Sequence, residues 1–149
     1  MNTVAEVKNH LEYLGYEVDY GQDDNNLLFC SKQGYPPLMI RHSENRMQFT
    51  GTYTINEIAK NDPVEFLKYL NALNIATSVT TFYISNEGNF YFSAPYIGIY
   101  SKKHFAFFLY LWESDIGETL DKVPNTERFL GCLDNLAQES HIKNADAYA

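Results

Sequence analysis

The segment from Thr81 to Ser93 constrains the fold more than any other part of the chain, because only one pairing of it separates apolar from polar side chains. If Asn86-Glu87-Gly88 forms a three-residue loop with a left-handed Gly88, the flanking runs form an antiparallel hairpin. One face then carries Phe82, Ile84, Phe90 and Phe92, and the other carries Thr81, Tyr83, Tyr91 and Ser93. A two-residue loop would instead set apolar residues opposite polar ones. The sequence therefore predicts a hairpin with one buried face.

Residues 1–54 follow the pattern of a helix and an antiparallel meander. A helix is predicted from Thr3 to Gly15, because apolar residues recur at helical spacing at Val4, Val7, Leu11 and Leu14. Turns at 22–26, 34–37 and 43–45 separate four predicted strands, which are Tyr16–Tyr20, Leu27–Ser31, Leu38–His42 and Arg46–Thr54. In the last strand, alternation places Met47, Phe49 and Tyr53 toward the core.

Two predicted helices flank the hairpin. The first is capped by Asp62, has Pro63 at its first position and runs to about Asn74. Its apolar stripe is Phe66, Leu67, Leu70 and Leu73. The second is capped by Ser101 and covers 102–116, with a stripe of Phe105, Phe108, Leu109 and Trp112. Between hairpin and second helix, the strand either continues through Pro95 or bends away there, because proline cannot donate in a ladder.

The C-terminal part is expected to add one more helix. Residues 117–124 are predicted to be a polar link, 125–142 a helix that begins near Asn125, and 143–149 a frayed tail. The element order α-β-β-β-β-α-β-β-α-α indicates an α+β fold. A chain of 149 residues fits a single domain, with 1–116 as its core.

The net charge of −8 limits the partners that this chain can bind. Nucleic-acid binders need a basic stripe, and anionic membranes also attract basic segments, so both are excluded as expected partners. A basic protein is favoured instead. Neither an export leader nor an apolar stretch of roughly 18 residues is found, so a cytoplasmic location is expected. Cys30 and Cys132 are interpreted as reduced thiols, with one long disulfide left open as the alternative.

No pattern of catalytic or metal-binding residues is found, so neither enzyme activity nor a cofactor or metal is predicted. The oxygen-rich segment 23–26 is interpreted as a turn, because it lacks the glycine and glutamate of a calcium loop. The strongest catalytic candidate is Cys30 with His42, which strand pairing across the 34–37 loop could bring together. A buried cysteine and a histidine at a strand end are the favoured interpretation of the pair.

A surface remains as the candidate site. Thr81, Tyr83, Tyr91 and Ser93 form a face that either binds a peptide or second subunit, or is covered by the last helix. Glu113 and Asp115, near the end of the aromatic helix, either contact a partner or belong to a solvated face. The predicted function is a non-enzymatic protein-binding module, chaperone-like or adaptor-like. The alternative is an immunity or inhibitor protein that neutralises a basic toxin or enzyme, and the aromatic helix is either the central packing helix or a homodimer seam.

The order of the elements resembles the type III secretion chaperone-like fold and, within it, the YbjN-like family of bacterial proteins. The residues that carry this resemblance are the run Phe66–Asn74, the Phe82–Phe92 hairpin and the Phe105–Trp112 helix. The resemblance covers about residues 3–116. It implies a non-enzymatic, often dimeric protein that holds an unfolded polypeptide segment or acts in regulation and stress. It supplies no site residues.

Overall fold

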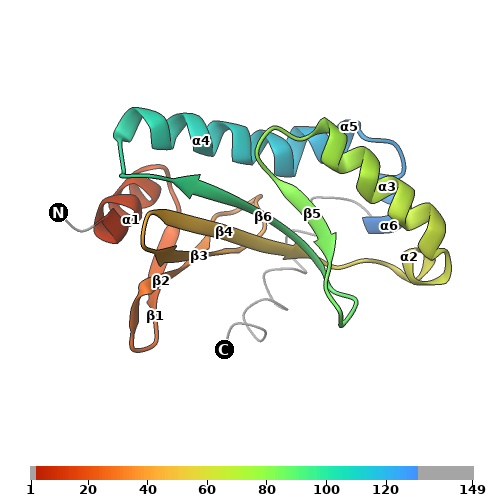
Figure 1. The fold of residues 1–149 in the computed structure, drawn as a ribbon, viewed down its shortest axis with the longest axis horizontal. Coiled ribbons are helices and arrows are strands. Elements are labelled where there is room, and N and C mark those ends of the chain that lie inside the picture. Colours follow the sequence, from red (N-terminus) through yellow and green to blue (C-terminus); the bar gives the residue numbers. More distant parts are fainter. Residues whose placement is uncertain (1–2, 131–149) are drawn as a thin grey trace.

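The computed structural model describes residues 3–130, which form one antiparallel sheet with helices on one side (Figure 1). Its strands are β1 Glu17–Gly21, β2 Asp24–Ser31, β3 Leu38–Ser43, β4 Arg46–Tyr53, β5 Thr81–Ile84 and β6 Phe90–Ile97. The six strands lie in the order β1-β2-β3-β4-β6-β5, so β6 is inserted between β4 and β5. The α+β class predicted from the sequence is confirmed.

The described helices are α1 Thr3–Tyr13, α2 Glu57–Asn61, α3 Pro63–Ala76, α4 Lys102–Ser114, the π-helix η1 Asp115–Thr119, α5 Leu120–Lys122 and α6 Thr126–Leu130. Figure 1 shows α4 lying along the sheet, with α1 near its N-terminal end and α3 near its C-terminal end. The same arrangement follows from contacts, since His10 of α1 touches Phe105 of α4 with ring centroids 5.0 Å apart. One face of the sheet therefore holds the core.

The core is built on aromatic side chains from α4 and the two central strands. The indole of Trp112 is fully buried and lies 5.6 Å from the ring of Phe49 in β4 and 5.5 Å from that of Phe92 in β6. Phe108 also packs edge-on against Phe49, at 4.9 Å. Aromatic pairs in this geometry add roughly 0.5–1.5 kcal/mol each beyond the area that they bury. The predicted stripe of α4 thus belongs to the core of the chain itself, which makes α4 the central packing helix.

The hairpin has the predicted register. Phe82 pairs with Phe92 and Tyr83 with Tyr91 in the antiparallel ladder. Gly88 has a φ of +84°, a conformation that glycine adopts without steric cost, and the Ser85 amide donates to the Asn89 carbonyl at 2.8 Å to close the loop. The strand β6 then continues through Pro95 to Ile97. Pairing with β5 ends at Ser93, so Pro95 has no neighbouring strand on the side away from β4, and proline is tolerated at such an edge position.

The outer edge of β5 is occupied by a side chain. The amide of Asn74, near the end of α3, donates to the Phe82 carbonyl at 3.0 Å and accepts from the Phe82 N–H at 2.8 Å. These are the two bonds that a neighbouring strand would make with that residue. Asn74 therefore takes the place of a seventh strand and blocks pairing with another chain at this point.

The prediction of a polar link over 117–124 is wrong. The chain forms η1 and α5 there, because Leu120 and Val123 are apolar and buried. The hydroxyl of Tyr53 donates to the Ile116 carbonyl at 3.1 Å, which satisfies a carbonyl in the π-helical turn. The hydroxyl of Thr126 donates to the Leu120 carbonyl and lies 2.8 Å from the hydroxyl of Tyr69.

Other predicted boundaries shift by smaller amounts. The turn predicted at 22–26 is shorter, because β2 already begins at Asp24. In α3 the apolar stripe includes Tyr69, which is buried, and excludes Leu67, which is 60% exposed. Leu14, placed in the stripe of the first helix, is exposed beyond the end of α1. The predicted helix beyond residue 130, the tail at 143–149 and Cys132 lie outside the described residues.

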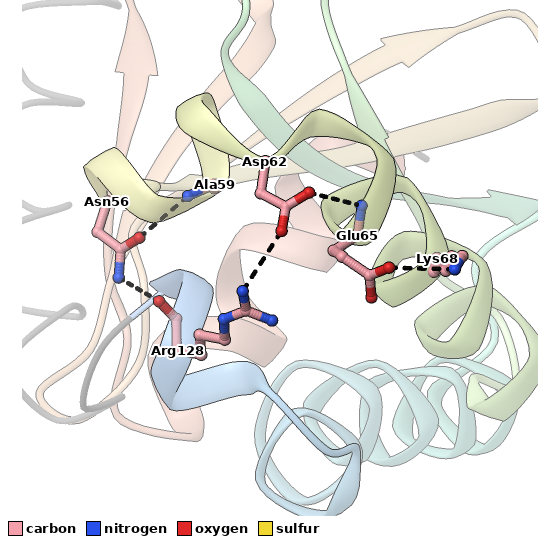
Figure 2. Close-up of polar contacts among 6 residues, drawn as sticks. All are labelled: Asn56, Ala59, Asp62, Glu65, Lys68 and Arg128. Carbon is pink, nitrogen blue, oxygen red and sulfur yellow. Dashed lines mark hydrogen bonds and ion pairs between the residues drawn. The ribbon is translucent and has the colours of Figure 1, made fainter.

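Two helix caps also hold α6 in place (Figure 2). The side chain of Asn56 accepts from the Ala59 N–H at the start of α2 and donates to the carbonyl of Arg128. Asp62 caps α3 as predicted, by accepting from the Glu65 N–H, and its second oxygen lies 3.4 Å from the guanidinium of Arg128. This ion pair is exposed and adds little to stability. The hydrogen bond from the Asn56 side chain to the Arg128 carbonyl therefore does more to position α6.

Replacing Asn74 by alanine should expose the edge of β5. We expect Asn74→Ala to lower the free energy of unfolding by about 1–2 kcal/mol, since two hydrogen bonds are lost, and to promote concentration-dependent self-association. Urea unfolding and analytical ultracentrifugation measure the two effects. Asn71→Ala, at an exposed position of the same helix, is the matched control. An Asn74→Ala protein that is as stable and as monodisperse as the control would contradict the edge-blocking role.

Candidate protein-binding surface

The face of the sheet opposite the helices carries the predicted partner-binding tyrosines. Strand side chains alternate, so residues between the buried ones of β2 to β6 point to this second face, here called the open face. One row of paired residues crosses it in the order Phe29, Met39, Thr50, Ser93 and Thr81. The helices of residues 3–130 pack on the other face. This row is therefore apolar in β2 and β3 and carries hydroxyl groups in β4, β6 and β5.

Tyr83 and Tyr91 form a stacked pair on the open face. Their ring centroids are 5.6 Å apart with planes inclined by 24°, and they are direct partners in the β5–β6 ladder. Tyr83 is 38% exposed and Thr81 beside it is exposed, while Ser93 is half-buried. We call these four residues the tyrosine shelf. The sequence prediction that they share one face is confirmed. The alternative, in which helix 125–142 covers them, involves residues beyond 130 and so stays a prediction.

Glu113 lies on the other side of the sheet from the tyrosine shelf. It belongs to the last turn of α4, and its Oε1 atom accepts a hydrogen bond of 2.9 Å from the hydroxyl of Tyr16. Its negative charge is the main cause of the raised pKa of Tyr35. The structure therefore does not bring Glu113 and the shelf together into one surface.

Asp115 is an interior residue, so its assignment to a partner-binding or solvated face is wrong. It is 1% exposed. One carboxylate oxygen accepts from the Ser78 N–H at 2.9 Å, and the other accepts from the N–H groups of Val79 and Thr80 at 2.9 and 3.0 Å. A buried carboxylate is tolerated when charge-assisted hydrogen bonds replace its hydration. Asp115 therefore joins the end of α4 to the segment that leads into β5.

Stability should depend strongly on this carboxylate. Asp115→Asn keeps the size of the side chain but leaves only one acceptor oxygen for three N–H groups, so we expect a loss of roughly 3 kcal/mol in the free energy of unfolding. Urea unfolding followed by circular dichroism measures it. Asp121→Asn, at an exposed position, should change stability by no more than about 0.5 kcal/mol. Equal stability of the two variants would show that the three hydrogen bonds contribute little.

Cys30 and His42 lie on neighbouring strands but at different levels of the ladder. Cys30 pairs with Leu38, and His42 lies four residues further along β3, so their backbones are about 14 Å apart. The imidazole of His42 lies instead 3.4 Å from the side-chain oxygen of Asn26. Burial, with a smaller effect of Asp19, raises the pKa of the Cys30 thiol to about 12. The proposed cysteine–histidine pair is thus not formed.

The Cys30 thiol should resist alkylation while the protein is folded. With a pKa of about 12, only about one thiol in ten thousand is ionised at pH 8, against about one in ten for the ordinary value of 9.0. In a Cys132→Ser variant, we expect iodoacetamide to label the native protein very slowly and the urea-unfolded protein rapidly, as measured by mass spectrometry. Rapid labelling of a protein with a native circular dichroism spectrum would contradict this environment.

Among residues 3–130, no group of three acidic, histidine or cysteine side chains is arranged to hold a metal ion. In the same part of the chain, no helix has the length and apolar character needed to cross a bilayer. The outer side of α4 carries two large exposed side chains, Phe107 at 63% and Tyr110 at 69%. Homodimer formation through this helix stays a prediction.

One group of residues was missed by the sequence analysis. Tyr16, Lys32 and Tyr35 lie together beside Glu113, although Glu113 is 97 positions from Tyr16. The only local signal is the spacing of three between Lys32 and Tyr35, which flank a glycine turn, and it is too common to be informative.

Comparison with solved structures identifies a similar fold. No family model and no curated protein sequence matches the chain. Among solved structures, YbjN from E. coli, a proposed transcription regulator, superposes with a TM-score of 0.63 over 87% of this chain and 96% of that one, at 13% sequence identity. The fold is therefore YbjN-like, as the sequence predicted. Membership of the family stays a prediction.

Proposed function

We propose that this protein is a non-enzymatic binding module that holds a basic polypeptide partner on the open face of its sheet. The observation that carries the proposal is the stacked pair of Tyr83 and Tyr91 on a face that the helices of residues 3–130 leave uncovered. Tyrosine is enriched at protein interfaces, because it combines a large apolar ring with a hydroxyl that tolerates water. The hydroxyl groups of Thr81 and Ser93 flank the pair.

The partner's charge follows from that of the chain. With 19 acidic against 11 basic side chains, the protein attracts a cationic polypeptide and repels a phosphate backbone. The similar protein YbjN is described as a proposed transcription regulator. If the present chain has a regulatory role, we propose that it acts through contacts with proteins rather than with DNA.

The mode of binding is restricted by Asn74. Its side chain occupies the backbone groups of Phe82 at the edge of β5, so a partner segment cannot continue the sheet there as an added strand. The partner would lie across the face and contact side chains. An adaptor or chaperone would accept several extended segments in this way. An inhibitor of a basic toxin, the alternative function, would bind a single folded partner in a one-to-one complex.

Truncation of the exposed tyrosine tests the proposal. We expect Tyr83→Ala to weaken binding of the partner at least tenfold, which corresponds to about 1.4 kcal/mol and is typical of an aromatic side chain at the centre of an interface. The tagged protein is used to capture partners from its host, and the captured proteins are quantified by mass spectrometry. Their affinity is then measured with purified components.

Tyr110→Ala is the matched control, because Tyr110 is more exposed than Tyr83 but lies on the outer side of α4. A partner of the open face is basic, is retained by the control and is lost with Tyr83→Ala. A partner that both variants retain equally would contradict the proposed surface. Thermal unfolding of both variants shows whether Tyr83→Ala acts through stability, for which a loss of up to about 1 kcal/mol is expected in a strand.

A further inference from the structure

The ammonium group of Lys32 lies over two neighbouring tyrosine rings. Its Nζ atom is 5.1 Å from the ring centroid of Tyr16 and 5.0 Å from that of Tyr35, and the two centroids are 6.4 Å apart with planes inclined by 48°. Both distances fall within the range of a cation–π interaction. Two neighbouring rings that both face one cation form adjoining walls of an aromatic cage, the kind of site that proteins use to bind alkylammonium groups.

A carboxylate supports the same site. Glu113 accepts the hydrogen bond of the Tyr16 hydroxyl, which fixes the orientation of that ring, and its charge acts on Tyr35 as well. The pKa of Tyr16 is raised by burial and, secondly, by Glu113, so both phenols stay neutral at physiological pH. The site therefore presents two neutral ring faces and one negative charge, which together favour a cation.

Lys32 is a replaceable occupant of this site. None of the ion pairs found among residues 3–130 includes its ammonium group, and the side chain is only half-buried. Its stem runs past Gly15, where an added Cβ would lie 3.8 Å from the Lys32 Cε atom. The long side chain can leave the rings by rotation of its own bonds, without a change in β2 or α1. Tyr35 is half-buried, so solvent reaches the site when Lys32 turns away.

We propose that Tyr16, Tyr35 and Glu113 form a binding site for an alkylammonium group, which Lys32 occupies in the unliganded protein. The ligand is a lysine side chain of a polypeptide, methylated or not, or a free small alkylammonium ion. Lys32 competes with it, so the apparent affinity is the intrinsic affinity multiplied by the fraction of molecules in which Lys32 has left the rings. This site is independent of the tyrosine shelf and uses none of its residues.

Removal of the occupant tests the proposal. We expect Lys32→Ala to bind tetramethylammonium about tenfold more tightly than the unmodified protein, a change of about 1.4 kcal/mol. The titration is followed by NMR through the ring resonances of Tyr16 and Tyr35. Lys8→Ala is the matched control. Lys8 lies 5.7 Å from the single ring of Tyr20, and its removal should create no new site.

Two further variants, made in the Lys32→Ala background, test the contributions of the rings and of the negative charge to binding. Tyr35→Ala removes a half-buried loop side chain and should abolish binding, whereas Tyr16 is 3% exposed and is left in place to preserve the fold. Glu113→Gln keeps an acceptor for the Tyr16 hydroxyl but removes the charge, so binding should weaken severalfold. Circular dichroism confirms that each variant is folded.

The source of the ligand is decided by a second titration with a short peptide that contains trimethyllysine and with its unmethylated form. Binding of a peptide at least tenfold more tightly than tetramethylammonium assigns a polypeptide, and equal affinity assigns a small free cation. The proposal is overturned if Lys32→Ala binds tetramethylammonium no better than the unmodified protein or the Lys8→Ala control. It is also overturned if Tyr35→Ala leaves the binding unchanged.

Discussion

The packing of α4 against one face of the sheet organises the rest of this protein. Trp112 touches both Phe49 and Phe92, so it fixes the helix over the boundary between β4 and β6, the two neighbouring strands that are furthest apart in the sequence. Because the inward side chains of β4 and β6 are mostly large, apolar and buried, the described helices pack on this face. The indole N–H of Trp112 finds no acceptor within the described part of the chain, so Trp112 contributes through the packing of its rings.

Two polar side chains, Asp115 and Asn74, fix β5 to the helices that pack on the aromatic core. Asp115 fixes the segment before β5 to the end of α4, and Asn74 fixes the edge of the same strand to α3. Both accept hydrogen bonds from backbone N–H groups that would otherwise bond to water or to another chain. The short strand β5 is therefore held from three directions: by β6 in the sheet, by α3 at its edge and by α4 at its beginning. A rigid β5 is the condition for placing Tyr83 and Tyr91 in fixed stacking.

The elements that sequence reasoning predicted well are those specified by local alternation. The register of the hairpin followed from residues 81–93 alone, because a single shift would have mixed phenylalanine with polar partners. Asp115 could not be assigned in this way. An acidic residue at the end of a helix normally faces water, and its burial depends on three backbone groups at 78–80 that have no side-chain signature. The neighbouring strands of Cys30 and His42 were predicted, but the level at which the strands pair decides whether two side chains meet.

The acidic character of the chain has different consequences at the two ends of the sheet. Near β1 and β2, the charge of Glu113 acts together with aromatic rings that already hold a cation from the chain itself. Near β5 and β6, the tyrosine shelf has no carboxylate among its four residues and offers ring area and hydroxyl groups. Long-range attraction by the net charge therefore serves to bring a basic polypeptide close, while its grip on the open face depends on tyrosine contacts. Affinity at the shelf should accordingly vary less with salt than the rate of association does, because screening weakens the attraction between distant charges more than it weakens the contact of rings.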